Sequence, residues 1–288
     1  TLGPSGCDGD DGDGVDDADE PSIRGDILLS AHNDVVDIQN GVVAGSINFG
    51  GGQDTLSISG GALVSGQITD PGGSLAINLG KGTLSVTNPE PLQLSSLNIA
   101  NDGTLLISAD PSAGTNTKLI VSGAANLASG AKIGLTLQSV MDSPTRFTVI
   151  EAGSLTAGAI NPDLVGLTPY LYIAQATADQ SAGEIYLDVR ARTASELGFN
   201  RAQTSAYNAV LKAIGNDDAI EASVLSQTTR AGLVNIYDQM LPDTGEGMFA
   251  AIDTANQLMA QATSQRPDPH DRYGPDSFWV QEINTFVR

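Results

Sequence analysis

The sequence of 288 residues is poor in three residue classes, and each shortage excludes something. It has one cysteine, Cys7, so no disulfide can form within the chain. Aromatic residues make up only 5 %, so any core must be built from small and branched aliphatic side chains. Basic residues are few as well: 13 Lys and Arg stand against 34 Asp and Glu, a net charge of −21. Because phosphate groups and anionic membranes bind clustered positive charge, the composition argues against nucleic acid as a partner and disfavours an anionic membrane surface.

Long apolar runs are missing too. No stretch approaches the roughly 20 apolar residues of a membrane-spanning helix. No signal peptide is visible, and the first residue is Thr1 rather than Met. Near the other end, Phe278-Trp-Val-Gln-Glu282 begins an aromatic strand pattern with nothing after it to pair with, and a lone strand is unstable in water. We therefore expect the chain to be a piece of a larger protein.

What the sequence does have is glycine, 33 residues of it, and a repeated β pattern over residues 25–118. Two apolar residues at positions i and i+2 begin each unit, and the aligned pairs are Val36 and Ile38, Leu56 and Ile58, and Ile77 and Leu79. A second apolar strand follows each pair, and the residues that we align in it are Val43, Leu63 and Leu84. The spacings are about 20 residues, the length of one solenoid coil. The repeat predicts a mainly β fold, a right-handed parallel β-helix, with an antiparallel sandwich as the alternative.

Residues 119–193 keep the β pattern but hold most of the tyrosine and phenylalanine of the β region. The two exposed ends of a solenoid leave core residues uncovered, so an end needs bulkier side chains or a different structure to cover it. We therefore predict that residues 119–193 form the C-terminal cap of the β-helix.

The apolar spacing changes to that of a helix over residues 194–266. One face is predicted from residues four apart, namely Ala202, Ala206, Val210 and Ile214. A second is predicted before Pro242, from Leu233, Ile236, Tyr237, Met240 and Leu241. The longest predicted helix, residues 246–264, has a narrow apolar stripe and a length of about 28 Å. An α-helical segment therefore follows the predicted β-helix.

The order of these parts resembles the C-terminal half of an autotransporter, the type V secretion system of Gram-negative bacteria. Two runs resemble the autochaperone junction that caps the passenger, Val121-Ser-Gly-Ala-Ala-Asn-Leu127 and Phe147-Thr-Val-Ile-Glu-Ala-Gly-Ser-Leu155. Asn200-Arg-Ala-Gln-Thr-Ser-Ala-Tyr207 resembles the helical stretch that follows, and Tyr237-Asp-Gln-Met-Leu-Pro242 the motif before the last helix. Residues 267–288 would then be a linker and the first strand of a truncated translocator barrel.

The resemblance implies a passenger stalk and export junction at the surface of a Gram-negative bacterium, with a structural or adhesive role. It implies folding outside the cell on the cap as template, attachment to the outer membrane through the barrel, and help from the barrel assembly machinery. Residues 246–264 would occupy the barrel pore, or else pack in a small helical bundle. Two other functions stay open: the stalk of a secreted protease or esterase whose catalytic domain precedes residue 1, and a free-standing calcium-bound solenoid.

The acidic linker of residues 1–24 carries the one candidate cofactor site. The stretch from Asp11 to Glu20 resembles the calcium repeat of thrombospondin type 3 modules. The resemblance places calcium ligands at Asp11, Asp13, the Val15 carbonyl, Asp17 and Glu20. Gly9 occupies the first ligand position of that repeat and departs from its pattern. The alternative is a solvated acidic linker.

No catalytic set is evident, and we predict no enzymatic activity in these residues. His32 and His270 lack metal-ligand spacing, and there is no Gly-x-Ser-x-Gly motif. Four acids lie near the predicted strand ends, at Asp34, Asp37, Asp54 and Asp70. Acidic side chains at such positions more often form turns than catalyse reactions.

Overall fold

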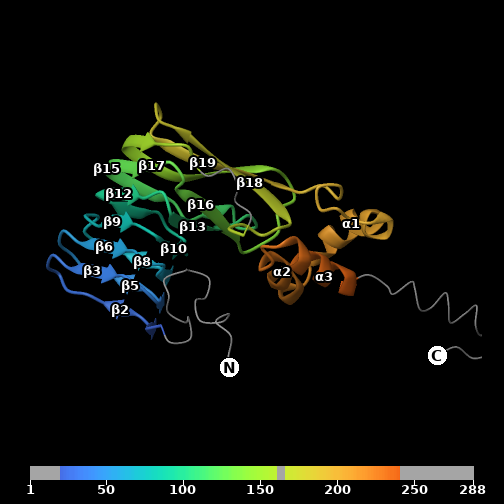
Figure 1. The fold of residues 1–288 in the computed structure, drawn as a ribbon, viewed down its shortest axis with the longest axis horizontal. Helices are drawn as coiled ribbons and strands as arrows, with labels where there is room; N and C mark the ends of the chain where they lie inside the picture. Colours follow the sequence, from blue (N-terminus) through green and yellow to red (C-terminus); the bar gives the residue numbers. More distant parts are fainter. Residues whose placement is uncertain (1–19, 161–165, 241–288) are drawn as a thin grey trace, which may run out of the picture. The chain divides into compact units, whose positions relative to one another are not determined.

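Residues 20–160 and 166–240 are described by the computed structural model, in which strands dominate (Figure 1). Most of the strands pair in parallel, and three helices follow the last strand within this part of the chain. The mainly β prediction is confirmed. Residues 1–19, 161–165 and 241–288 lie outside the described residues, and with them the predicted pore helix 246–264 and the predicted barrel strand in 267–288.

Three parallel sheets share the repeated units. The first contains β1 (Ser22–Arg24), β4 (Val42–Ala44), β7 (Leu63–Gly66), β10 (Gly82–Val86) and β13 (Gly103–Asp110). The smallest contains β2 (Ile27–Leu28), β5 (Ile47–Asn48) and β8 (Ile68–Thr69). The largest begins with β3 (Val35–Ile38), β6 (Thr55–Ile58), β9 (Ala76–Leu79) and β12 (Ser96–Ile99). The chain therefore visits the sheets in turn, and each visit adds a strand beside the previous one.

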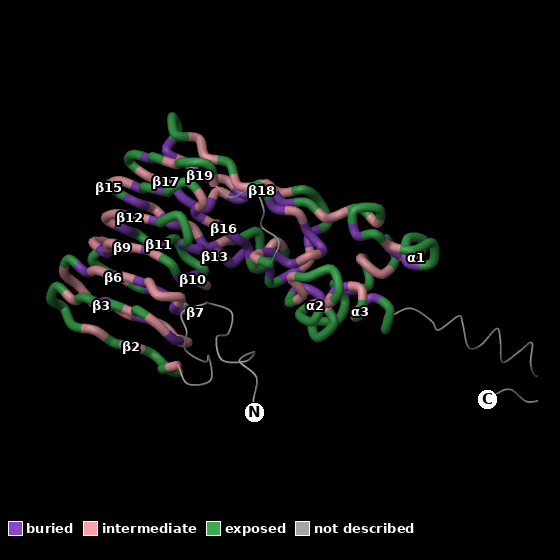
Figure 2. The backbone as a smooth tube through the Cα atoms, viewed as in Figure 1, coloured by how far each residue is buried: buried purple, intermediate pink, exposed green. Residues whose placement is uncertain are grey.

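The register keeps like residues above one another. In the largest sheet Val36 pairs with Leu56, and Leu56 pairs with Ile77, as the repeat predicts. Because side chains alternate across a strand, this column points inward while its neighbours point outward. Leu56, Ile77 and Leu97 are fully buried, and buried segments line the inside of the stack (Figure 2). The core is thus a set of aliphatic columns.

In the first sheet the predicted register is wrong by one residue. Val43 pairs with Val64, and Leu63 pairs with Val42 instead. Leu63 therefore faces outward with 38 % exposure, whereas Val64 is 1 % exposed. The reason is an extra residue in the turn before β7, where Gly60 and Gly61 both have positive φ. A Cβ on Gly60 would overlap the carbonyl oxygen of Gln39 in the preceding unit, so glycine is required there.

The pairing changes character toward the end of the stack. β15 (Leu119–Leu127) still pairs in parallel with β12 and, on its other side, with β17 (Thr145–Ala157). β19 (Glu184–Ala191) then pairs antiparallel with β17, and β18 (Tyr172–Asp179) pairs antiparallel with β19. Three shorter or lateral strands complete the sheets: β11 (Leu92–Leu94), β14 (Thr115–Asn116) and β16 (Lys132–Leu137). The switch to antiparallel pairing occurs within the predicted cap.

The helices are α1 (Arg201–Ile214), α2 (Asp218–Leu225) and α3 (Arg230–Met240). Asn200 starts α1 with a capping box, in which its side chain accepts from Gln203 N. The buried residues of α1 are Gln203, Tyr207 and Ile214. Of the predicted face, Ile214 is buried, Ala206 and Val210 are half-buried, and Ala202 is exposed, so the prediction is wrong at Ala202. None of the helices in the described ranges is long and apolar enough to cross a bilayer.

Candidate functional site

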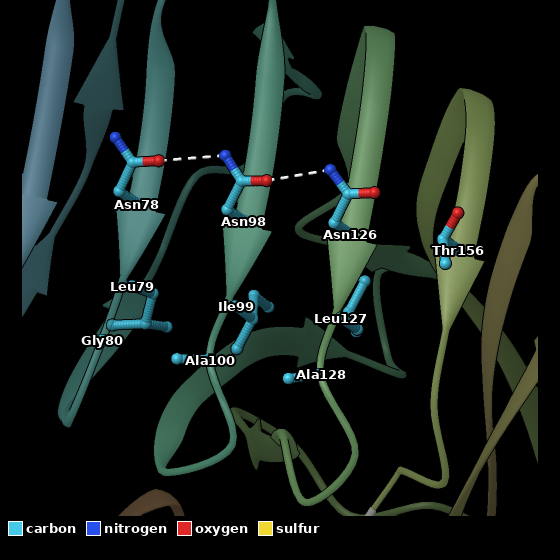
Figure 3. Close-up of a pocket in the computed structure, with 10 residues that line it drawn as sticks. All are labelled: Asn78, Leu79, Gly80, Asn98, Ile99, Ala100, Asn126, Leu127, Ala128 and Thr156. Carbon is cyan, nitrogen blue, oxygen red and sulfur yellow. Dashed lines mark hydrogen bonds between the residues drawn. The ribbon is translucent and has the colours of Figure 1, made fainter.

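A row of side-chain amides crosses the outer face of the largest sheet (Figure 3). Asn78 on β9, Asn98 on β12 and Asn126 on β15 are register partners. Asn98 Nδ2 donates to Asn78 Oδ1 at 2.9 Å, and Asn126 Nδ2 donates to Asn98 Oδ1 at 2.9 Å. These three residues form the amide ladder. All the bonds run in one direction, so the amide dipoles align and strengthen one another.

A shallow hollow of about 490 Å³ lies beside the amide ladder, where the strands end (Figure 3). Thr156 on β17 extends the polar row by one strand. Small residues border the hollow at the strand ends, namely Gly80, Ala100 and Ala128. We call the hollow, with the amide ladder, Thr156 and these small residues, the amide trough. None of the ten residues that line it has an ionisable side chain.

Sequence reasoning missed the amide ladder, although the signal is present. Each asparagine lies between two inward-facing apolar residues, as Asn78 lies between Ile77 and Leu79. An asparagine recurring at the same place in successive repeat units predicts a column of amides on the outer face of a parallel sheet. The spacing is 20 residues from Asn78 to Asn98 but longer from there to Asn126, because β13 is longer than β10 in the preceding coil and is followed by the antiparallel strand β14.

A second group of contacts joins the helices to the last strands. Glu221 on α2 accepts a hydrogen bond from Val140 N at 2.6 Å, just after β16. Tyr207 on α1 donates from its hydroxyl to Arg192 O at 2.5 Å, and Tyr170 N donates to Gln227 O at 2.6 Å. The helical segment therefore makes polar contacts with the main chain of the predicted cap.

Tyr172 lies at the centre of this junction. Its ring is buried and its hydroxyl oxygen accepts a hydrogen bond from Met141 N at 2.8 Å. Burial raises the pKa of the Tyr172 hydroxyl to about 12, because the phenolate would lose its hydration. The neutral hydroxyl is thus a structural acceptor rather than an acid or base for chemistry near neutral pH.

Polar groups also surround a larger hollow at the junction, about 970 Å³, between the segment after β16 and the helices α1 and α2. Its charged residues carry both signs: Lys212 faces the same space as Asp142, Asp218 and Glu221. Glu221 accepts its hydrogen bond from Val140 N at the edge of this hollow, so its carboxylate also holds the segment after β16 against α2.

Two arginine–carboxylate pairs lie on the surface of the antiparallel strands. Arg146 bonds both oxygens of Asp188, at 2.7 and 2.8 Å, and this lowers the pKa of the Asp188 carboxyl. Arg190 bonds both oxygens of Glu196 at 2.8 Å, and with Thr193 it lowers the pKa of Glu196 to about 2. Both pairs are solvent-exposed, so each adds little to stability. Arg146 and Asp188 join register partners on β17 and β19, and Arg190 and Glu196 join the end of β19 to the turn that follows it.

The predicted calcium site lies almost entirely outside the described residues. Asp11, Asp13, Val15 and Asp17 lie outside the described residues, and only Glu20 is within them. No group of three or more His, Cys, Asp or Glu side chains suited to a metal occurs in residues 20–160 and 166–240. Calcium binding by residues 11–20 therefore stays a prediction.

Three of the four acids near predicted strand ends accept hydrogen bonds from the main chain, whereas Asp37 Oδ2 accepts one from Gln39 Nε2 at 2.7 Å. Asp34 Oδ2 accepts from Ser30 N at 2.9 Å, and Asp70 Oδ2 accepts from Ser74 N at 2.6 Å and Leu75 N at 2.7 Å. Asp54 Oδ1 accepts from Asp34 N at 2.8 Å, one unit earlier in the chain. These contacts are what turn-forming acids make.

No family model, no curated protein and no solved structure matches this chain.

Proposed function

We propose that the chain is the passenger stalk and export junction of an outer-membrane autotransporter, with a structural or adhesive role at the cell surface. One observation carries the proposal: parallel strands, repeated every 20 or 21 residues in the first coils and at wider spacing in the last ones, give way to antiparallel strands and then to docked helices. That order is the one in which the autotransporter-like motifs occur along the sequence. A stack of this kind is suited to display, because its length grows with the number of units.

The finer fold within this proposal is a right-handed parallel β-helix capped by β17, β18 and β19. Parallel pairing between successive units supports it, since a sandwich would pair neighbouring strands mostly antiparallel. The order of the strands supports the β-helix as well. Each repeat unit contributes one strand to each of three sheets in turn, as one coil of a β-helix does.

The proposal includes self-templated folding outside the cell. One edge of β17 pairs with the antiparallel strand β19, and its other edge pairs with β15. The cap therefore presents an edge of β17 on which the first coil to fold can pair. Each further coil needs only the edge of its neighbour, which lets a stack grow from one end. In the same proposal the outer membrane and its barrel assembly machinery are the export partners.

Cysteine labelling of intact cells tests this location. The expressed protein would be the full-length gene product with Cys7→Ser and Ser129→Cys, because Ser129 is exposed after β15. A membrane-impermeant maleimide should label it on intact Gram-negative cells. A matched Ala125→Cys variant, buried in β15, should stay unlabelled until the protein is denatured. Labelling of Ser129→Cys only after the cells are lysed would contradict the surface location.

A further inference from the structure

We propose that the amide trough binds a neutral polyhydroxylated chain, that is, an uncharged polysaccharide, lying across the strands. This ligand class would account for the adhesive role. It rests on the proposed function only for the location of the site at the cell surface.

The charge of the protein and of the amide trough limits the class of ligand. The protein has a net charge of −21, yet no ionisable side chain lines the amide trough. A charged ligand would lose hydration on entering and meet no opposite charge there. A polyanion would also be repelled by the protein as a whole. The site therefore favours an uncharged partner.

The free hydrogen-bonding groups of the amide ladder limit the class of ligand further. Within the amide ladder, Asn98 uses one N–H on Asn78 and one carbonyl lone pair on Asn126. An amide has two N–H donors and two acceptor lone pairs, so Asn98 keeps one of each for a ligand. A hydroxyl both donates and accepts, and so can bond to both groups of such an amide. Hydroxyl-rich ligands match this surface better than groups that only donate or only accept.

The direction of the amide trough argues against an extended peptide. Peptides that join a sheet add along a strand edge, where they pair with main-chain groups. The amide trough instead runs across β9, β12, β15 and β17, and the main chain there is already paired between neighbouring strands. Polar positions recur once per strand, about 4.8 Å apart. From Asn78 to Thr156 the polar row thus spans about 14 Å.

The apolar residues at the edge of the amide trough favour a sugar ring over a lipid chain as the bound group. Ala100 and Ala128 are exposed and offer only methyl groups, and the large aliphatic residues at the strand ends point into the core. This surface can pack against the C–H groups of a sugar ring but is too small to bury an acyl chain. Because the amides are held by strands and by one another, little ordering cost is added on binding.

Affinity electrophoresis of the purified chain tests the inference, since it detects binding on the order of millimolar. The probes are gels containing one of four neutral polymers, dextran, mannan, arabinoxylan or laminarin, with anionic polygalacturonate as the charged control. Asn98→Ala breaks the amide ladder at its centre, and Ala100→Leu fills the trough while leaving the ladder intact. Asn208→Ala removes an exposed amide from α1 and is the matched control.

At least one neutral polymer should retard the wild-type chain. Asn98→Ala and Ala100→Leu should each reduce the retardation at least fivefold, while Asn208→Ala retains it. The inference is overturned if none of the four neutral polymers retards the chain, if polygalacturonate retards it equally, or if both trough variants behave like wild type. Circular dichroism melts show whether each variant is folded. If a neutral polymer retards the chain but Ser129→Cys is not labelled on intact cells, the polysaccharide site is supported and only the stalk proposal is contradicted.

Discussion

At the scale of single residues, several buried polar side chains in the described part of the chain are matched to main-chain partners. Asn88 does this with both ends of its amide: Oδ1 accepts from Ile68 N at 2.9 Å, and Nδ2 donates to Ile68 O at 2.6 Å. The amide thereby replaces a missing strand partner at the end of the smallest sheet. Tyr172 does the same for Met141 N at the junction with the helices. Such groups are costly to lose, because their partners are left buried without a hydrogen bond.

Tyr172→Phe tests this at the junction. Removing the hydroxyl leaves Met141 N without its acceptor, which we expect to lower the free energy of unfolding by about 1–3 kcal/mol. Urea denaturation at pH 7 measures this free energy of unfolding.

The dependence of stability on alkaline pH is a second measurement. The folded-state pKa of Tyr172, about 12, lies above the ordinary value of 10.0, so this group favours folding below pH 10 and loses that contribution as the pH rises toward 12.

Wild type should therefore lose stability between pH 10 and 12, and Tyr172→Phe should lose less over the same interval. Some loss remains in the variant, because burial also raises the pKa of Tyr237 to about 12. An unchanged urea midpoint together with an unchanged alkaline slope would show that the Tyr172 hydroxyl has no structural role.

At the scale of elements, the unit of this fold is one coil of about 20 residues. The inward column of the largest sheet could be predicted from the sequence, since Val36, Leu56 and Ile77 recur every 20 or 21 residues and each is followed by a polar residue. The register of the first sheet could not, because the residue added before Leu63 changes the turn and leaves the alternation intact. Hydrophobic alternation specifies which face is buried but not how long the turn is.

The helices and the amide ladder show a second limit of sequence reasoning. The buried face of α1 contains Gln203 and Tyr207, whose polar ends bond to Asp238 and Arg192. A search for aliphatic stripes overlooks such residues and favours alanines instead. The amide ladder was missed for a related reason, because polar outward positions on a strand look like ordinary solvated surface until the register aligns them.

Deleting one whole coil tests the modular character of the stack. Removal of residues 41–60 joins Asn40 to Gly61 and places β3 beside β9, with Val36 beneath Ile77 in the column that Leu56 occupied. We expect a folded chain with one cooperative transition and a modestly lower melting temperature, since only one set of neighbour contacts is lost. Removal of residues 41–50 is the matched half-coil control and should lower the melting temperature more than the full-coil deletion, because it puts the adjacent strands out of register. Equal damage from both deletions would contradict independent coils.

At the scale of the whole molecule, both the stalk proposal and the amide trough depend on one feature, the in-register stacking of coils along a single direction. Outward residues on the largest sheet form a continuous column from Asp37 through Ser57 and the amide ladder to Thr156. Five strand spacings separate its ends, which corresponds to about 24 Å at 4.8 Å per strand. No other feature of the fold sets that distance.

Pulsed electron spin resonance between two spin labels measures this stacking most directly. The chain would carry Cys7→Ser with Asp37→Cys and Thr156→Cys, both at exposed outward positions. Stacked coils should give a single narrow distance near 24 Å, allowing a few ångströms for the label arms. When the second label moves to position 126, the distance should be shorter by one strand spacing, about 4.8 Å. A broad distribution, or two pairs whose distances do not differ by one spacing, would contradict the stacked coils.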